Sequence, residues 1–245
     1  EGDLSRKWQR ILGDVQKRLE GWVFSLGARR RHEKNIALLA IKCLHELQHD
    51  DTMKSVCSKV LAAEDGGLCL RDLIITPVDS AALFEFLGNN KNLKRLIFVD
   101  CRIHGDYSYI KMVKSMLNNP TNSILSLKLC RSCTTQSVKY LGDALKSKNC
   151  KLSSLDLSDG KITDQGAEYL SEALKSGNCK LTSLNLRNII GITHQGAKYL
   201  SEALKSGNCK LTSLNLRNNG IANQGAEYLS EALKSGNCKL TSLDL

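Results

Sequence analysis

Aromatic residues make up only 5% of this 245-residue chain, and proline occurs only twice. Their scarcity excludes a core built on large rings, so the core must consist mainly of Leu, Ile and Ala. No run approaches the roughly 18 to 20 apolar residues that a membrane helix needs. The charged first residues also lack the apolar stretch of a secretory signal. We therefore expect neither a membrane span nor a membrane partner.

Ten cysteines are too few and too evenly spread for a small disulfide scaffold. Cys130 and Cys133 form a Cys-x-x-Cys step that has no matching second pair, so we expect no zinc site there. The pattern as a whole is typical of a reducing, cytoplasmic compartment. Four cysteines recur at one position of a repeated segment, where a small buried hydrophobe explains them better than metal or disulfides: Cys150, Cys179, Cys209 and Cys238.

A tandem repeat dominates the chain. Residues 163–186 and 193–216 are identical at 22 of 24 positions, and residues 163–186 and 222–245 are identical at 21. Units of this kind stack so that each one packs on its neighbours, as in a solenoid. Each unit ends in Leu-x-x-Leu-x-Leu, with its middle leucine 28 to 31 residues after the previous one: Leu68, Leu96, Leu127, Leu155, Leu184, Leu214 and Leu243.

One short strand and one helix are predicted in each unit. Alternating leucines such as Leu184 and Leu186 predict a strand that is buried on one face. The segment that follows has apolar residues at helical spacing, and we expect Thr163 or Asp164 to cap its start and Gly177 to end it. Helices are roughly 10 Å thick, whereas strands stack about 4.8 Å apart, so the strands must line the inside of a horseshoe.

The Cys-Lys-Leu-x-x-Leu-x-Leu signature that begins at each repeat cysteine resembles the repeats of the NLR family of intracellular innate immune receptors. The units also resemble the ribonuclease-inhibitor type of leucine-rich repeat. Over residues 66–245 this resemblance implies an α/β leucine-rich-repeat horseshoe with a parallel inner sheet and outer helices. About six units and a final strand are expected.

Residues 1–65 are expected to form an α-helical domain that caps the first repeat. Apolar residues between Leu4 and Leu26 fall at helical spacing, and further helices are predicted near 33–49 and 51–62. Residues 37–51 resemble the helical domain that joins the repeats of NLR proteins to a nucleotide-binding NACHT module. The chain contains no G-x-x-x-x-G-K-[ST] phosphate loop, so we expect no nucleotide or other cofactor and place that module among the partners in cis.

A literal H-E-x-x-H motif at residues 45–49 suggests a different function. On a helix it would place two zinc-ligating histidines one turn apart, with Glu46 as general base. The extended zinc-peptidase spacing fails because Thr52 and Ser55 stand where Gly and His are required. Glu64 or Glu85 would have to supply the third ligand. We therefore expect no metal and no enzymatic activity.

Lysines recur along the stack and could follow the phosphates of a nucleic acid. However, Glu172, Glu202 and Glu231 each precede one of these lysines by three residues on the same predicted helix, which neutralises the row. No aromatic side chains alternate with the lysines to stack on bases. A basic helix from Trp8 to Trp22 resembles peptides that bind calmodulin or a membrane, but core packing explains its apolar face. We expect no nucleic-acid partner.

Side chains that alternate with the buried leucines point to the concave side of the predicted sheet. They are expected to form three rows across the repeats: Ile97, Lys128, Asp156, Asn185, Asn215 and Asp244; Val99, Cys130, Ser158, Arg187 and Arg217; and Ser126, Ser154, Ser183, Ser213 and Ser242. They are not needed for the core and are therefore free to bind a partner. Arg187 and Arg217 are the best anchors, because arginine is enriched at binding hot spots. The candidate binding residues are Lys128, Asp156, Ser158, Asn185, Arg187, Asn215 and Arg217.

The resemblance implies the ligand-sensing and autoregulatory region of an NLR-like receptor in the cytoplasm. Such a region would bind a protein or a pathogen-derived ligand on its concave face, and the ligand would shift the receptor between two states. The alternative is a stand-alone leucine-rich-repeat inhibitor or scaffold protein. With a net charge of +10, its partner would be acidic.

Overall fold

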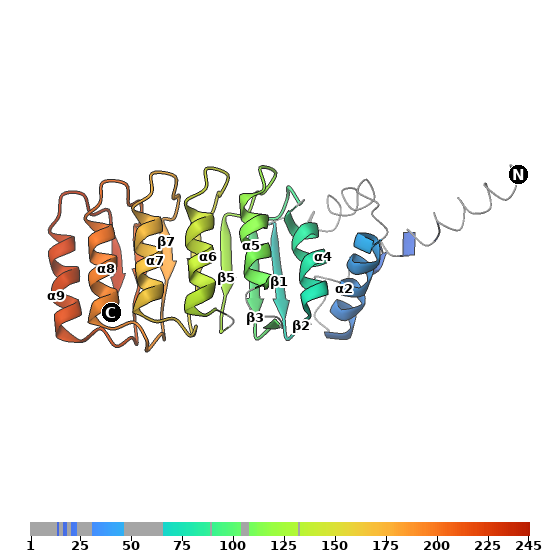
Figure 1. Cartoon of the computed structure of the whole chain (residues 1–245), viewed down its shortest axis with the longest axis horizontal. Helices are drawn as coiled ribbons and strands as arrows, with labels where there is room; N and C mark the ends of the chain where they lie inside the picture. The colour runs from blue at the N-terminus through green and yellow to red at the C-terminus, as the bar shows by residue number, and fades with distance from the viewer. Residues whose placement is uncertain are drawn as a thin grey trace, which may run out of the picture.

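The computed structural model describes residues 14, 17–18, 21–23, 31–46, 66–88, 90–103, 108–131 and 133–245. Strands and helices alternate along the repeats (Figure 1). The labelled helices are α2 (Arg31–Glu46), α4 (Pro77–Gly88), α5 (Ser108–Asn118), α6 (Thr135–Leu145), α7 (Asp164–Leu174), α8 (His194–Leu204) and α9 (Ala222–Leu233). The strands are β1 (Gly67–Arg71), β2 (Ile74–Ile75), β3 (Arg95–Val99), β4 (Arg102–Ile103), β5 (Ser126–Leu129), β6 (Ser154–Asp156), β7 (Ser183–Asn185), β8 (Ser213–Asn215) and β9 (Ser242–Asp244).

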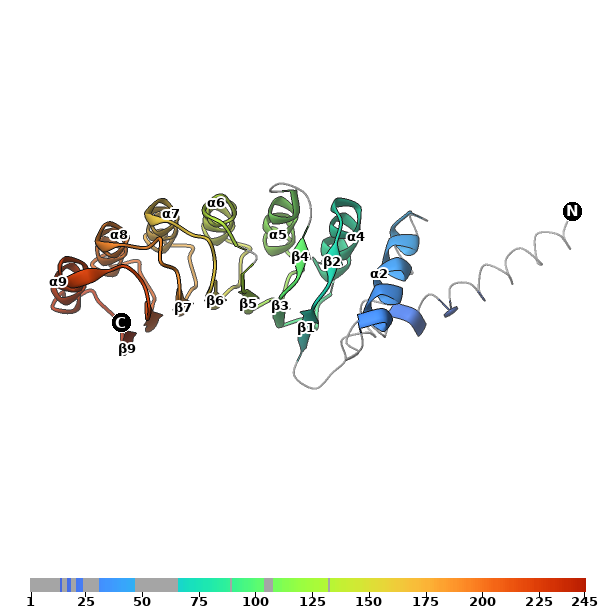
Figure 2. The ribbon, with the colours of Figure 1, turned by 90° about the horizontal axis from the view of Figure 1, so that it is seen from below.

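Seven strands form one parallel sheet in the order β1-β3-β5-β6-β7-β8-β9, and β2 and β4 form a separate parallel pair. The middle leucines of successive units lie opposite one another, from Leu68 beside Leu96 to Leu214 beside Leu243. Figure 2 shows the sheet strands along the inner side of an arc and helices α4 to α9 along its outer side. The predicted α/β horseshoe with outer helices is therefore confirmed.

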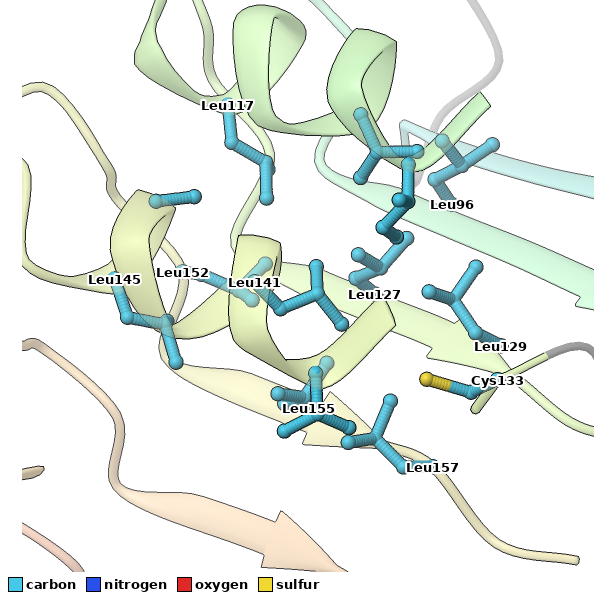
Figure 3. Close-up of a cluster of buried hydrophobic side chains, with 14 of the residues drawn as sticks. Leu96, Leu117, Leu127, Leu129, Cys133, Leu141, Leu145, Leu152, Leu155 and Leu157 are labelled. Atoms are coloured by element: carbon cyan, nitrogen blue, oxygen red, sulfur yellow. The ribbon is translucent and has the colours of Figure 1, made fainter. Parts of the chain in front are cut away.

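The core lies between the sheet and the outer helices. In one layer, Leu127 and Leu155 from adjacent strands meet Leu141 and Leu145 from α6, and all four are buried (Figure 3). The alternating strand leucines thus pack against the apolar face of the helix, as the periods of about two residues in the strand and about 3.6 residues in the helix predict. Because each layer continues into the next, the buried residues form one cluster along the stack.

Side-chain hydrogen bonds between neighbouring repeats support this register. The Thr182 hydroxyl donates to the carbonyl of Ser153 at 3.1 Å, and the Thr212 hydroxyl donates to the carbonyl of Thr182 at 3.1 Å. The Asn219 amide donates to the carbonyl of Leu186, at the end of the preceding strand, at 2.9 Å. These bonds tie each repeat to the one before it and add to the backbone ladder.

The turn after each strand uses a left-handed backbone. Asp and Asn tolerate this conformation because their short side chains bond locally. Arg131 is the residue that does not suit it, and its guanidinium is held by Asp100 at 2.9 Å. The residues concerned have φ between 51° and 62° and occur once per repeat: Asp72, Asp100, Arg131, Asp159, Asn188 and Asn218.

The sequence predicts that a glycine ends the helix of each repeat, but the structure ends these helices in another way. The C-cap of α7, Lys175, has a right-handed φ of −72°, and among the described glycines only Gly66 has a positive φ. The carbonyl of Lys175 instead accepts a hydrogen bond from Asn208 of the next repeat at 3.0 Å. A tertiary contact thus replaces the local glycine cap. The same contact is made by Asn149, Asn178 and Asn237.

The start of α7 also differs from the prediction. Thr163 is its N-cap residue, but its side chain makes no capping hydrogen bond. Asp164 caps the following helix, α8: its carboxylate accepts from the backbone N–H groups of Thr193 at 2.7 Å and Gly196 at 2.8 Å. The Thr193 hydroxyl donates to the same carboxylate at 2.7 Å. A Cβ at Gly196 would lie 2.6 Å from the Asp164 oxygen, so glycine makes room for this contact.

The N-terminal region is described in part. The helix predicted near 33–49 is present as α2, which packs against α4 and buries Ala37 and Ile41 in the same core cluster. Of the first predicted helix, residues 14, 17–18 and 21–23 are described and are helical, whereas the one near 51–62 lies outside the described residues. The domain boundary between residues 65 and 66 stays a prediction.

Within the described ranges, no helix has the length and apolar character to cross a membrane.

Replacing Asp164 with Ala should destabilise the solenoid by about 1–3 kcal/mol, because three hydrogen bonds at the start of α8 are lost and two backbone N–H groups lose their acceptor. Urea unfolding followed by circular dichroism measures the change. Asn223→Ala is the matched control, because Asn223 holds the corresponding position in α9 and its side chain is exposed without a hydrogen bond to any described residue. Equal losses in the two variants would contradict the capping role of Asp164.

The repeat cysteines Cys150, Cys179 and Cys209 are buried, as predicted, and Cys238 is half-buried. Burial raises the pKa of the three buried thiols, and it raises the pKa of Cys133 to about 12. Alkylation of the folded protein at pH about 8 should therefore spare Cys133, Cys150, Cys179 and Cys209, since the thiolate is the reactive form.

Exposed Cys69 is the internal control for this alkylation experiment and should be modified first. Mass spectrometry of digested protein gives the extent of reaction at each position. In urea all of these cysteines should react. Equal modification of Cys69 and Cys179 without urea would show that the core layers open readily.

Candidate binding surface

The concave face of the sheet carries three rows of side chains that run across the repeats. They alternate with the buried leucines, so they belong to the face of the sheet that the helices leave uncovered. Strand pairing places these residues side by side, in the order expected from the sequence. The first row is Ser126, Ser154, Ser183, Ser213 and Ser242; the second is Ile97, Lys128, Asp156, Asn185, Asn215 and Asp244. The third row continues beyond the strands through Val99, Cys130, Ser158, Arg187 and Arg217.

Two of the candidate residues, Lys128 and Asp156, pair with each other across adjacent strands. The Lys128 ammonium lies 2.8 Å from the Asp156 carboxylate, and that carboxylate also accepts the backbone N–H of Ser158 at 3.0 Å. Burial alone would raise the pKa of Asp156, but the hydrogen bonds from Lys128 and Ser158 outweigh it and hold the pKa low. The bond to Asp156 likewise raises the pKa of Lys128 against the effect of burial. Both groups are therefore charged at neutral pH and neutralise each other.

Ser158 lies in the third row but is only 6% exposed. Its hydroxyl is 3.3 Å from the sulfur of Cys130 in the preceding repeat. A small hydroxyl in this position fills the space between neighbouring side chains and presents little surface. Of the seven candidate residues, Ser158 therefore offers the least area to a partner.

Arg187 and Arg217 are exposed, and neither forms an ion pair with any described residue. Their backbone N–H groups donate to the side-chain oxygens of Asn185 at 3.1 Å and Asn215 at 3.0 Å. Each asparagine therefore fixes the backbone beneath an arginine whose side chain remains available to solvent. This part of the concave face carries uncompensated positive charge, unlike the paired Lys128 and Asp156.

A shallow hollow of about 420 Å³ lies on the concave side of the first repeats. Its apolar part comes from Ile97 and Val99, and its rim includes the ion pair between Arg131 and Asp100. Arg71 lines the hollow without an ion pair to any described residue. The full lining is Cys69, Arg71, Ile97, Val99, Asp100, Lys128, Cys130, Arg131 and Asp159.

Of the residues that line this hollow, only Lys128 is among the candidates chosen from the sequence. Ile97, Val99 and Cys130 belong to the rows predicted from the sequence but were not chosen as candidates. Cys69 and Arg71 were missed because the early repeats have drifted, which makes the rows harder to extend into β1. The signal that would have found Cys69 and Arg71 is their place at the start of the second and third rows, opposite Ile97 and Val99. Asp100, Arg131 and Asp159 lie in the left-handed turns that follow the strands.

The H-E-x-x-H segment is described only through Glu46 in α2, so His49 lies outside the described residues, as does Glu64. His45 Nε2 lies 3.0 Å from the carboxylate of Glu85 in α4, a contact that joins the N-terminal helix to the first repeat. No group of three or more His, Cys, Asp or Glu side chains in the described ranges could hold a metal ion.

The lysine rows on the helix side are neutralised differently from the prediction. Glu172 pairs with Lys146 of the preceding repeat at 3.0 Å and not with Lys175 in its own unit. Lys175 in turn lies 4.0 Å from Glu202, and Lys205 lies 3.6 Å from Glu231. These pairs connect neighbouring helices across the outer surface, because the stacking of the units brings their helices side by side.

The model of the leucine-rich-repeat family matches residues 148–171 and 207–230. Each match begins just before the repeat cysteine and ends within the helix that follows the strand. No curated protein matches this chain. Proteins built from such repeats commonly bind other proteins. The matched segments lie within the repeated strand–helix units, and the fold is that of a leucine-rich-repeat solenoid.

Proposed function

We propose that this chain is the ligand-sensing and autoregulatory protein-binding region of an NLR-like innate immune receptor that works in the cytoplasm. It acts by binding and not by catalysis. The observation that carries the proposal is the concave sheet, whose rows of mostly polar side chains alternate with the leucines of the core. The candidate ligand contacts are Lys128, Asp156, Ser158, Asn185, Arg187, Asn215 and Arg217.

The near-identity of the later repeats supports a role for the concave rows. Ser158, Arg187 and Arg217 occupy one position in three successive repeats, whereas the leucines beneath them do not change. Helix positions 165–167 and 195–197 are likewise identical. Substitution on the concave side therefore alters the binding surface without altering the core. A family of receptors can therefore use one repeat scaffold to bind different ligands.

The position of α2 supports the receptor interpretation. This helix packs directly on α4, the helix of the first repeat, and His45 contacts Glu85 across that junction. Through this packing, a module on the N-terminal side would respond to what the repeats bind. We propose that the repeats hold a nucleotide-binding module inactive, and that a protein or pathogen-derived ligand shifts the population toward the released state.

The alternative function is that of a stand-alone inhibitor or scaffold protein with an acidic partner. The net charge of +10 and the unpaired arginines Arg187 and Arg217 favour it. The coding sequence upstream of Glu1 separates the two proposals. A G-x-x-x-x-G-K-[ST] loop after a predicted strand supports the receptor, and its absence supports the free-standing protein.

If the receptor proposal is right, the chain should bind the nucleotide module encoded upstream when the two are mixed as separate proteins. Binding should slow nucleotide exchange by the module, because docking on the repeats favours its closed state. Release of a fluorescent nucleotide measures the exchange rate. An unrelated leucine-rich-repeat protein is the control, and an unchanged exchange rate with our chain would overturn the autoregulatory role.

Blocking the concave face should abolish this interaction. Asn215→Trp places a large ring in the second row and should weaken binding of the module at least about tenfold by steric exclusion. Lys198→Trp puts the same ring on the exposed side of α8 and should leave binding unchanged. Calorimetric titration of both variants gives the affinities. Loss of binding in Lys198→Trp alone would place the interaction on the helix side.

A further inference from the structure

We infer that Arg187, Arg217, Asn185 and Asn215 form a clamp for one acidic side chain of a partner protein, with Ile190 as the adjacent apolar contact. The inference rests on the proposed function, since it specifies the chemistry of the partner at the same concave face. It selects two repeats, those of β7 and β8, as the place where a carboxylate is recognised.

The two arginines lie directly beside each other. The Leu186 N–H donates to the Asn215 carbonyl at 2.8 Å and the Asn188 N–H donates to the Arg217 carbonyl at 3.0 Å, and these two bonds bracket Arg187. Parallel neighbours in a sheet are about 4.8 Å apart. Like charges placed directly opposite on adjacent strands repel each other. With no acidic group of the described residues within ion-pair distance, an anion from outside would relieve this repulsion.

The asparagines beneath the arginines add further donors. The side-chain oxygens of Asn185 and Asn215 are already used by the backbone N–H groups of Arg187 and Arg217. Their NH₂ groups have no acceptor among the described residues and remain available to a ligand. The four side chains therefore offer donors alone, and a carboxylate accepts at both of its oxygens from such a set.

Acidic residues bound this donor patch on both sides. Asp156 pairs with Asn185 in the sheet register, and Asp244 pairs with Asn215. A nucleic acid requires a continuous basic track along its phosphates. Here the track is interrupted by the neutralised pair of Lys128 and Asp156 on one side and by Asp244 on the other. A single acidic side chain fits between them. The charge pattern therefore favours a protein that presents one Asp or Glu at this point.

Ile190 supplies an exposed apolar side chain in the turn that follows Arg187. Residues 186–196 are one residue longer than the corresponding segments 157–166 and 216–225. A hydrogen bond from the Ile192 N–H to the Ile189 carbonyl at 3.0 Å closes the extra turn. That turn leaves Ile190 84% exposed, whereas Ile189 and Ile192 are buried. An isoleucine so exposed, three residues after Arg187, suits a partner whose acidic residue has an apolar neighbour.

The test uses the whole chain and a phage-displayed library of random peptides. Selected peptides should be enriched in an Asp or Glu next to an apolar residue. Arg187→Gln combined with Arg217→Gln should weaken binding of a selected peptide at least about tenfold, because the charge-assisted hydrogen bonds to the carboxylate are lost. Replacing the acidic residue of that peptide with its amide should weaken binding by a similar factor.

The control pair is Lys139→Gln with Lys198→Gln, which removes the same charge from exposed positions on α6 and α8 and should not change affinity. A selection without acidic peptides, or equal binding by the double arginine variant, overturns the clamp. Displacement of the peptide by inorganic phosphate at low concentration also overturns it, since that indicates a general anion site. A different result overturns the proposed function: Asn215→Trp would leave binding of the nucleotide module intact.

Discussion

The structure depends on one constraint: a single repeat cannot bury its leucines, so each unit needs the next. The strand leucines lie in a sheet in which each unit pairs in parallel with its neighbours, and the helix of the same unit covers them from outside. Parallel pairing fixes the register, because a shift by one residue would turn Leu184 toward solvent and Asn185 toward the core. The concave rows are a direct consequence of that register.

The same constraint separates stability from recognition. Only alternate strand positions enter the core, so the positions between them can vary at little cost to the fold. The chain uses this freedom unevenly: Lys128 and Asp156 neutralise each other, Ser158 is buried, and Arg187 and Arg217 face solvent without a partner. Nearly identical repeats thereby produce a surface whose charge changes from one strand to the next.

Contacts between repeats also replace interactions that are local in an isolated helix. Asp164 caps the helix after its own, Asn208 satisfies the end of the helix before its own, and Glu172 pairs with a lysine of the preceding unit. Each contact spans roughly one repeat in sequence. Such contacts make neighbouring units cooperative, since the loss of one unit leaves unsatisfied groups on the next.

The sequence by itself determined the repeat, the alternation of strand and helix, the horseshoe and the order of residues in each concave row. These features follow from periodicities of two and 3.6 residues and from the spacing of the leucines, which are local signals. Only the tertiary structure decided that Asp164 caps α8, that Ser158 is buried and that a hollow forms around Ile97. Those outcomes depend on side chains about one repeat apart, and their meeting is set by turn lengths and strand register that no single segment encodes.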